Sequence, residues 1–348
     1  MIPVLIRLDA NSSIGLGHLG RCLALSRALR RGGAQVTFGL SPFSSRDAFE
    51  RLRGANEAVV SVPCAEAGGA LDAQATREIA RDLGARALIL DGYHLRSQVL
   101  PAVRQPGVRL AYVDDVLSGA FDVDVFINPS LHGDHCQVSL PTGATALLGA
   151  AYSLIRAPFL EARSQRAKRE PGANLRVLVS MGGTDPGGIS LAVLRAFSGL
   201  AEPWRKRCDV SVLLSPNFHG WEEARHLVSL SDVRVALQTT VPELAPLLVD
   251  VDLAVVSAST TLAELSTVGV PAIAMATVDN QVPVAEAATR LGVARVVACD
   301  AEQITDAMTH LVKDGPGRER MAIRQREVVD GLGASRIADA ILRGLENT

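Results

Sequence analysis

The sequence predicts an α/β protein made of two parallel-sheet domains. Its 348 residues, divided by the ~100–200 residues of a typical domain, favour two compact domains. In each half, short runs rich in β-branched residues alternate with helical segments, which is the pattern of parallel sheets covered by helices. Between the halves, residues 162–173 are polar, strongly basic and contain Pro-Gly near their end. They indicate an interdomain linker, with a solvated helix end as the alternative.

The expected strands fall into two series, one in each half of the chain. Residues 19–30 follow the first strand and have apolar positions at helical spacing, which predicts a helix. From residue 301 onward the chain is helical and polar, with a break at Gly315. The predicted strands are 4–8, 35–38, 87–90, 110–113 and 123–127, then 176–180, 210–214, 253–256, 272–276 and 295–297. Open parallel sheets bind ligands beyond the carboxyl ends of their strands, so we expect functional residues in the following loops, facing a cleft between the domains.

The composition excludes several classes of protein. With 35 Lys+Arg against 37 Asp+Glu, the net charge is −2, which provides no global attraction for nucleic acid or an acidic membrane surface. The 5 cysteines form no CxxC pair, which argues against a disulfide framework or zinc ribbon and favours reduced thiols in a cytosol. No stretch of ~18 apolar residues occurs, so we expect a cytoplasmic protein without membrane insertion.

The first segment that could carry chemistry follows the first predicted strand. Gly15, Gly17 and Gly20 formally match the dinucleotide fingerprint GxGxxG. They begin several residues beyond the strand, and no acidic residue ends the second strand to bind a ribose, so a nicotinamide cofactor is not expected. The glycines instead place His18 at a helix amino end, where the helix dipole disfavours the imidazolium and leaves a base near neutral pH. A helix cap or packing residue is the alternative for His18.

Residues 179–189 repeat the pattern of strand, glycine turn and helix. Gly182 and Gly183 let the backbone come close to a ligand, and Thr184 and Asp185 can cap the helix that follows. The negative charge of Asp185 argues against a phosphate directly on this turn. A plain connecting turn is therefore a serious alternative.

Hydroxyl side chains crowd a predicted strand-to-helix turn at residues 257–261. The free backbone N–H groups and hydroxyls of such a turn suit a diphosphate. Glu264 lies about one turn into the helix, where it can accept hydrogen bonds from a ribose diol. The alternative is a helix cap with a capping-box-like glutamate. The hydroxyl residues are Ser257, Ser259, Thr260 and Thr261.

Two further segments give weaker signals. Asn280 and Gln281, in the polar loop after the next strand, can each donate and accept hydrogen bonds at a sugar. Residues 132–136 contain side chains of the metal-ligand type, but no matching fourth ligand appears elsewhere, so a surface loop is favoured and no metal is expected. The motifs of serine hydrolases, zincins and P-loop enzymes do not occur.

Taken together, these motifs resemble the UDP-sugar hydrolases of the pseudaminic acid pathway, which are related to the spore-coat polysaccharide proteins and, more remotely, to the MurG glycosyltransferases. The combination of Gly-x-Gly-His with Met-Gly-Gly-Thr-Asp, in this order, is quite specific for the family. The sequence departs from the family at Gly92, where relatives carry a bulkier residue, and at His94, which has no counterpart there. The matching residues are Arg7, Asp9, 14–18, Arg21, Asp91, Tyr93, Asp114, Asp115, Asn128, Tyr152, Ile155, Arg156, 181–185, Ser257, Ser259, Glu264, Asn280 and Gln281.

The resemblance implies a GT-B fold, in which two Rossmann-like, doubly wound parallel-sheet domains face a central cleft. The implied division is residues 1–160 for the domain that the sugar faces, 161–174 for the linker, 175–334 for the domain that holds UDP, and 335–348 for a helix that returns to the first domain. The family reaction hydrolyses UDP-2,4-diacetamido-2,4,6-trideoxy-β-L-altropyranose to UDP and free sugar, for pseudaminic-type nonulosonic acid biosynthesis. It proceeds with inversion and cleavage of the C1–O bond, without a metal or cofactor.

The resemblance also assigns roles to individual residues. His18 would be the catalytic base or would position the attacking water, and Tyr93 and Asn280 would line the sugar site. Glu264 would bind the ribose, and the turn at 257–261 the diphosphate. The other residues expected at the substrate are Asp9, Gly15, Gly17, Arg21, Asp115, Gly182, Gly183, Thr184 and Gln281.

Two other functions remain open at this point. A glycosyltransferase on the same fold would use an acceptor hydroxyl in place of water, and a non-catalytic nucleotide-sugar-binding protein would bind without turnover. In each case the partner is a small UDP-sugar, with no nucleic acid. A monomer is a possible oligomeric state.

Overall fold

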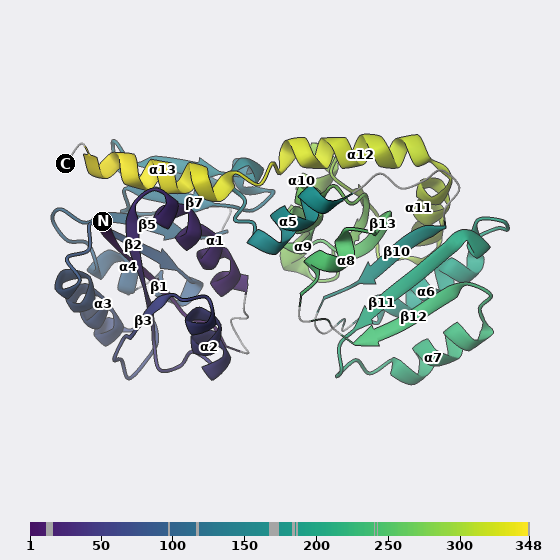
Figure 1. The fold of residues 1–348 in the computed structure, drawn as a ribbon, viewed down its shortest axis with the longest axis horizontal. Coiled ribbons are helices and arrows are strands. Elements are labelled where there is room, and N and C mark those ends of the chain that lie inside the picture. Colours follow the sequence, from purple (N-terminus) through teal and green to yellow (C-terminus); the bar gives the residue numbers. More distant parts are fainter. Residues whose placement is uncertain are drawn as a thin grey trace. The chain divides into compact units, whose positions relative to one another are not determined.

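The alternation of apolar strands and helices produces two α/β units, each built on a parallel sheet (Figure 1). The computed structural model describes residues 1–11, 17–96, 98–115, 118–166, 174–182, 185, 187–239, 241 and 243–346. Met1–Arg156 and Gly331–Thr348 form the first unit, and Ala157–Asp330 form the second unit. None of the helices in these described ranges combines the length and apolar character needed to cross a membrane.

The first unit contains a sheet of 7 strands in the order β3-β2-β1-β4-β5-β7-β9. Its strands are β1 (Ile2–Leu8), β2 (Ala34–Leu40), β3 (Ala58–Ser61), β4 (Ala87–Asp91), β5 (Arg109–Val113), β7 (Val125–Asn128) and β9 (Thr145–Leu148), beside a separate pair of β6 (Ser118–Ala120) and β8 (Gln137–Ser139). Its helices are α1 (Gly17–Arg31), α2 (Arg46–Gly54), α3 (Ala70–Asp82), α4 (Val99–Ala102) and α13 (Gly333–Glu346), with short 3-10 turns η1 (Tyr93–Leu95), η2 (Gly133–His135) and η3 (Ala150–Tyr152).

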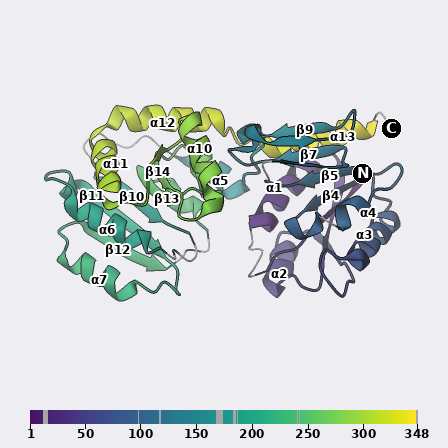
Figure 2. The same ribbon diagram turned by 180° about the vertical axis from the view of Figure 1, so that it is seen from behind.

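Alternate side chains of β1 face opposite sides of this sheet. Ile6 and its neighbours two residues away join the apolar core beneath α1 and α13, whereas Leu5 joins the core beneath α3 and α4. The same alternation carries Arg7 to the α3 side, where it is fully buried. Helix α13, at the carboxyl end of the chain, lies along α1 in both views (Figures 1 and 2) and buries Ile337 and Ile341 in the first core.

The second unit contains a sheet of 6 strands in the order β12-β11-β10-β13-β14-β15. The strands are β10 (Leu175–Ser180), β11 (Cys208–Leu214), β12 (Arg234–Thr239), β13 (Leu253–Ser257), β14 (Ala272–Met275) and β15 (Arg295–Val296). The helices are α5 (Ala157–Gln165), α6 (Ile189–Gly199), α7 (Trp221–Leu230), α8 (Ala245–Leu248), α9 (Thr261–Val268), α10 (Val282–Leu291), α11 (Ala301–Lys313) and α12 (Gly315–Val328), with 3-10 turns η4 (Arg205–Arg207) and η5 (Asp279–Gln281). The predicted break at Gly315 is confirmed as the start of α12.

The sequence prediction differs from the structure mainly at the borders of the sheets. Edge strands β3, β9 and β12 were not predicted, and their side chains are largely exposed or only partly buried. An edge strand packs against one neighbour only, so it lacks the continuous apolar run that marks a central parallel strand. The start of the predicted linker is also different: residues up to Gln165 belong to α5, whose Phe159 and Ala162 are buried. Residues 167–173 of the predicted linker lie outside the described ranges.

Candidate functional site

The site candidates of the first unit gather where the strand order reverses. β1 pairs with β2 on one side and β4 on the other, so the chain leaves β1 and β4 toward opposite faces of the sheet, and a crevice forms beyond their ends. Helix α1 begins at Gly17, which confirms that His18 lies in the first turn of a helix. Nδ1 of His18 lies 2.6 Å from Oδ1 of Asp91, the last residue of β4. The fold therefore pairs an imidazole with a carboxylate across the reversal point.

Asp91 is an ionised carboxylate that fixes the tautomer of His18. Arg21 binds both of its oxygens, with Nε 2.7 Å from Oδ2, and the thiol of Cys22 donates to Oδ2 at 3.0 Å. Burial alone would raise the pKa of Asp91, but the charge and hydrogen bonds of Arg21 and the bond from His18 hold it well below its usual range. Nδ1 of His18 also lies 2.9 Å from Nη2 of Arg21, but its contact with Asp91 is the shorter one. Because an ionised carboxylate only accepts, we assign the proton of this short contact to Nδ1. Nε2 keeps its lone pair and has no partner among the described residues.

Tyr93 stands beside His18 and is held by Asp115. The two rings meet edge to face, with centroids 5.4 Å apart. The hydroxyl of Tyr93 donates to Oδ1 of Asp115 at 2.6 Å. Burial and this hydrogen bond raise the pKa of Tyr93, so the hydroxyl stays protonated. Since 53% of Tyr93 is exposed, its ring forms an accessible wall next to the imidazole, and Asp115 orients that wall.

A second buried network lies beneath the same end of the sheet. Arg7 binds both oxygens of Asp72, at 3.0 and 2.6 Å, and Oδ2 of Asp9 at 2.8 Å. Asp9 also accepts from the hydroxyl of Ser44 at 2.7 Å and from Nε2 of His94 at 2.9 Å. Only 1% of Asp9 is exposed, and its contact toward the surface is the hydrogen bond from His94. A direct contact of Asp9 with the substrate stays a prediction.

The second unit has its own reversal point, between β10 and β13. β10 pairs with β11 on one side and with β13 on the other, so the turns after β10 and β13 lie side by side. A Cβ at Gly182 would lie 3.8 Å from Oγ of Ser257, in ordinary van der Waals contact. Gly182 and Ser257 therefore come together as the sequence led us to expect, while Gly183 and Thr184 lie outside the described residues.

The amino end of α9 is open to a ligand. Its capping residue, Thr260, makes no side-chain hydrogen bond to the helix, so the capping alternative is not realised by this hydroxyl. The hydroxyls of Ser259, Thr260 and Thr261 form no hydrogen bond with any described residue. Glu264 lies in the first turn of α9, where the sequence placed it. Free N–H groups and hydroxyls at a helix amino end are a favourable environment for an anion.

The amino end of α6 is closed by contrast. The carboxylate of Asp185 accepts hydrogen bonds from the backbone N–H groups of Ile189 and Ser190, each at 2.9 Å. This confirms that Asp185 caps the helix. The carboxylate of Asp185 already occupies this helix end, which disfavours a phosphate there, as the sequence indicated.

The loop after β14 is braced by one of its predicted site residues. Oε1 of Gln281 accepts from the backbone N–H of Thr277 at 2.9 Å and from its hydroxyl at 3.1 Å. The acceptor of the Gln281 amide is thus used internally, and its amide N–H₂ remains for a ligand. Asn280 is exposed on η5 in the second unit, whereas His18 and Tyr93 belong to the first unit.

The glycines of the formal dinucleotide fingerprint have separate uses. A Cβ at Gly20 would lie 2.9 Å from Cδ of Arg156, so this glycine allows the arginine side chain to cross α1. A Cβ at Gly17 would meet no atom of the described residues within 4 Å. Gly15 lies outside the described residues.

The segment at residues 132–136 contacts the backbone of Asp115. Nε2 of His132 lies 3.1 Å from the backbone oxygen of Asp115 and donates to it. In the part of the chain that the structure describes, no group of 3 or more His, Cys, Asp and Glu side chains is arranged to hold a metal ion. His132 therefore braces the backbone of the residue that orients Tyr93.

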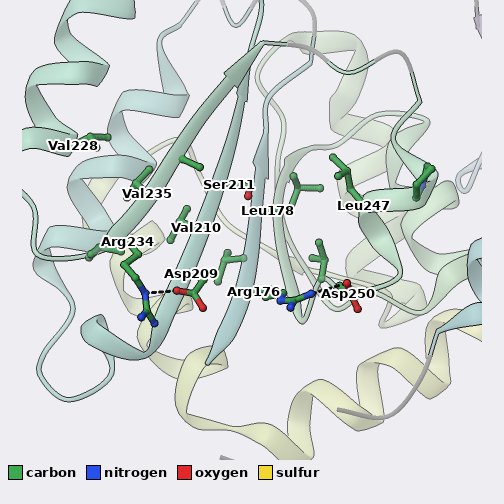
Figure 3. A pocket seen from close by; sticks show the side chains of 15 residues that line it. Arg176, Leu178, Asp209, Val210, Ser211, Val228, Arg234, Val235, Leu247 and Asp250 are labelled. Atoms are coloured by element: carbon green, nitrogen blue, oxygen red, sulfur yellow. Dashed lines mark ion pairs between the residues drawn. The ribbon is translucent and has the colours of Figure 1, made fainter. Parts of the chain in front are cut away.

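A cavity of ≈ 730 Å³ lies elsewhere in the second unit (Figure 3). It opens at the amino ends of β10, β11 and β12, the opposite edge of the sheet from Gly182. Its arginines are neutralised, since Arg176 pairs with Asp250 at 2.6 Å and Arg234 pairs with Asp209. Parallel sheets bind ligands at their carboxyl edge, so this cavity is not the candidate site.

Sequence reasoning assigned no role to several residues that build the first site. Asp91, Asp72 and His94 were not among the site candidates. One signal for them was present, because Arg7 is a charged residue inside an apolar strand and such a residue needs a buried partner. The partner itself comes from α3, 65 residues away along the chain, and no local pattern identifies it.

Comparison with known proteins places the chain in a common fold. No protein-family model matches the sequence, and no curated protein sequence matches it either. Solved structures do match over nearly the whole chain. MurG of Acinetobacter baumannii has a TM-score of 0.71 at 14% identity, covering 99% of this chain and 100% of that chain. UDP-GlcNAc 2-epimerase of Neisseria meningitidis, bound to UDP-GlcNAc, has a TM-score of 0.72 at 11% identity, covering 98% and 100%. MnaA of S. aureus, in a structure with UDP, has a TM-score of 0.66 at 10% identity, covering 100% and 98%.

At these identities the likeness establishes the fold, and it confirms the prediction of a GT-B architecture with two parallel-sheet α/β units. The remote resemblance to MurG is confirmed at the level of fold. The narrower resemblance to the pseudaminic acid hydrolases stays a prediction.

Proposed function

We propose that this protein hydrolyses a UDP-sugar and that His18 activates the attacking water. The observation that carries the proposal is the pair of His18 and Asp91 at the carboxyl edge of the first sheet, with Nε2 of the imidazole left as a proton acceptor. The fold supports the choice of ligand, because structural neighbours include an epimerase bound to UDP-GlcNAc and a protein bound to UDP. The sugar suggested by the sequence resemblance is a diacetamido-trideoxy hexose.

The proposed step is a single displacement with inversion at the anomeric carbon. The oxygen of water forms a bond to C1 of the sugar while its proton passes to Nε2 of His18. The bond between C1 and the diphosphate oxygen breaks, and its electron pair leaves with UDP. Asp91 stabilises the imidazolium that forms, and Arg21 keeps Asp91 ionised and in place.

The second unit would hold the nucleotide. We propose that the hydroxyls and backbone N–H groups at the start of α9 bind the diphosphate, and that Glu264 accepts hydrogen bonds from the ribose. Donors that are already oriented toward an anion stabilise the charge that develops on UDP as the bond to C1 breaks. Gln281 and Asn280 would contribute amide hydrogen bonds from the loop after β14.

The test is hydrolysis in water enriched in oxygen-18, with a panel of UDP-linked acetamido sugars. We expect release of UDP, with the oxygen-18 label in the free sugar and none in UDP. Proton NMR spectra recorded at once should show the sugar anomer whose configuration is opposite to that of the substrate. Label in UDP would mean attack at phosphorus, and release of no UDP from any acetamido sugar would refute the hydrolase function.

A glycosyltransferase is the second candidate, since the fold is shared with MurG and with the glycotransferase of kitacinnamycin. An acceptor hydroxyl would then take the place of water at His18. Reaction with and without added acceptor sugars separates the two, because a transferase yields a glycoside and little free sugar.

A further inference from the structure

A second imidazole stands at the candidate site, and the proposed reaction does not use it. His94 follows Tyr93 in η1, beyond the carboxyl end of β4. Its Nε2 lies 2.9 Å from Oδ2 of Asp9. Nδ1 of His94 has no partner among the described residues, and 21% of the side chain is exposed. Nε2 of His94 thus bonds to a buried carboxylate, and Nδ1 is available to a ligand.

The engaged side of the ring is rigidly held. Both oxygens of Asp9 are occupied, one by the backbone N–H of Ser41 and the hydroxyl of Ser44 and the other by Arg7 and His94. Arg7 is in turn bound by Asp72. Because Asp9 is an ionised acceptor, the proton of the contact lies on Nε2 of His94, and in that tautomer Nδ1 carries the lone pair. The network therefore sets both the orientation and the tautomer of His94.

Two glycines allow His94 its position, Gly92 beside the imidazole ring and Gly68 beside the backbone. Gly92 has φ +151°, and a Cβ there would lie 2.8 Å from Cε1 and 3.0 Å from Nδ1 of His94. Gly68 has φ +81°, and a Cβ there would overlap the backbone oxygen of His94. Gly92 and His94 are also the two positions at which the sequence departs from the hydrolases it resembles. The structure shows that the two departures are one feature, since the missing side chain at Gly92 leaves the space beside the ring.

We propose that His94 is a specificity-determining residue of the sugar site, whose Nδ1 accepts a hydrogen bond from a hydroxyl or amide N–H of the bound sugar. The ring follows directly on Tyr93, whose own ring lies beside that of His18. The proposal therefore places the free nitrogen of His94 at the sugar end of the site. A fixed lone pair accepts only from a donor, so this position discriminates against a sugar that presents a carbonyl oxygen or a methyl group there. The inference rests on the proposed nucleotide-sugar ligand but not on its hydrolysis.

Two conservative variants separate this contact from a purely structural role. In His94→Gln, the amide nitrogen reaches the position of Nε2, so the bond to Asp9 is kept and Nδ1 is lost. In His94→Asn, the amide oxygen replaces Nδ1 as an acceptor and the bond to Asp9 is lost. His226→Ala removes an exposed histidine of α7 in the second unit and is the matched control.

The experiment is titration calorimetry of each variant with UDP and with the tightest-binding of UDP-N-acetylglucosamine, UDP-N-acetylgalactosamine and UDP-glucose. For His94→Gln we expect about threefold to tenfold weaker binding of the UDP-sugar, the range of one net hydrogen bond, with unchanged binding of UDP and an unchanged thermal midpoint. His94→Asn should keep more of the discrimination and lose thermal stability. His226→Ala should match the wild type in all three measurements.

Other outcomes overturn the assignment. If His94→Gln binds the UDP-sugar as the wild type does, or loses affinity for UDP and UDP-sugar equally, Nδ1 makes no contact with the sugar. A wild-type protein that binds none of the three UDP-sugars also overturns it. Hydrolysis is measured on the same samples, so that the two proposals can fail separately. If UDP-sugar binding depends on His94 but no UDP is released, only the hydrolase proposal is refuted. If UDP is released at the same rate in wild type and His94→Gln, with equal UDP-sugar affinity, only the contact with His94 is refuted.

Discussion

The two strand-reversal points of the molecule are built from different chemistry. In the first unit the carboxyl edge of the sheet carries buried charges that are bonded to one another, as in the clusters around Asp91 and Asp9. In the second unit the equivalent edge carries the hydroxyls of Ser259 and Thr261, which bond to no described residue. The first edge resembles a set of fixed acids and bases, and the second resembles a set of open donors. The proposed function accordingly assigns proton transfer to the first edge and anion binding to the second, although the two sheets share a topology.

The physical reason lies in the cost of desolvation. A buried carboxylate is tolerated only with compensating donors, so Asp91 and Asp9 bring Arg21 and Arg7 with them and become rigid. Neutral hydroxyls and helix-end N–H groups can face water until a ligand arrives. If the two edges have different functions, substitutions at the first edge should change turnover and stability, and substitutions at the second should change UDP affinity.

Replacement of His18 should separate the two edges most sharply. We expect His18→Ala to reduce the rate of UDP release by about 10²–10⁴-fold, the usual contribution of a positioned base, with unchanged affinity for UDP. Steady-state kinetics and UDP titration on the same protein check this, with His226→Ala as the control. Turnover at the wild-type rate would remove His18 from the mechanism.

Removal of a buried carboxylate should destabilise the first unit. Asp72→Ala leaves Arg7 buried without its main partner, and we expect a loss of about 3–5 kcal/mol in the free energy of unfolding. Asp47→Ala removes an exposed partner of Arg51 and should cost at most about 1 kcal/mol. Urea unfolding followed by far-ultraviolet circular dichroism measures both, and equal losses would contradict the buried network.

The chain offers a spectroscopic way to assign such losses to one unit. Both tryptophans, Trp204 and Trp221, belong to the second unit, and all three tyrosines, Tyr93, Tyr112 and Tyr152, belong to the first. Tryptophan fluorescence therefore reports unfolding of the second unit, while near-ultraviolet tyrosine dichroism reports the first. We expect Asp72→Ala to shift the tyrosine transition only.

Acid should destabilise the first unit more than the second. The pKa values of Asp9 and Asp91 are held well below their usual range, so their stabilising contribution is present above pH ~4 and is lost as the pH falls toward the folded-state values. Between pH 6 and pH 3 we expect the free energy of unfolding from the tyrosine signal to fall by more than that from the tryptophan signal, with a difference of the order of a few kcal/mol. Parallel falls in the two signals would contradict the comparison.

The smallest effects are expected at the second edge. Ser259→Ala and Thr261→Val should each weaken UDP binding by about threefold to tenfold, because each removes one neutral hydrogen bond, without changing stability. Asp185→Ala should do the reverse, lowering the stability of the second unit by about 0.5–2 kcal/mol through loss of the α6 cap, with little change in UDP affinity. Calorimetry and tryptophan fluorescence distinguish these outcomes. Unchanged UDP affinity in both hydroxyl variants would place the diphosphate elsewhere.

Much of the architecture could be predicted from the sequence because central parallel strands carry an unmistakable pattern. The strands β1, β4 and β13 are apolar along their length, and the sequence placed each of them within a residue or two. Edge strands such as β12 could not be identified, because many of their side chains face solvent and need not be apolar.

The candidate site divides in the same way. His18, Asp185 and the turn at 257–261 lie in segments between a predicted strand and a predicted helix, so local pattern singled them out, whereas Tyr93 was indicated by the family resemblance. The partners that give them their properties come from distant segments: Asp91 lies 73 residues from His18, and Asp9 lies 85 residues from His94. Sequence separation of this size leaves no periodic signal.

The arginines show the same limit, since 3 of the 35 Lys+Arg residues are lysine and the other 32 are arginine. Composition alone gave the many arginines no structural role, yet the structure uses several to bond backbone oxygens where elements meet. Arg163 donates to the oxygens of Thr267 and Val329 at 3.2 and 3.3 Å, and Arg166 donates to that of Leu248 at 2.7 Å. A planar guanidinium with five donors can satisfy several carbonyls at once, which a lysine cannot do in the same geometry.

By itself, then, the sequence determined two parallel sheets, the loops that hold the candidate residues, and the placement of His18 and of the hydroxyl turn at helix starts. These depend on the local preferences of strands, glycine turns and helix ends. Only the tertiary structure decided which carboxylate orients which imidazole, that Asp9 is buried, and that Gly92 makes room for His94. Those outcomes depend on the strand order, because it is the pairing of β1 with β4 that brings the ends of two distant segments within hydrogen-bonding distance.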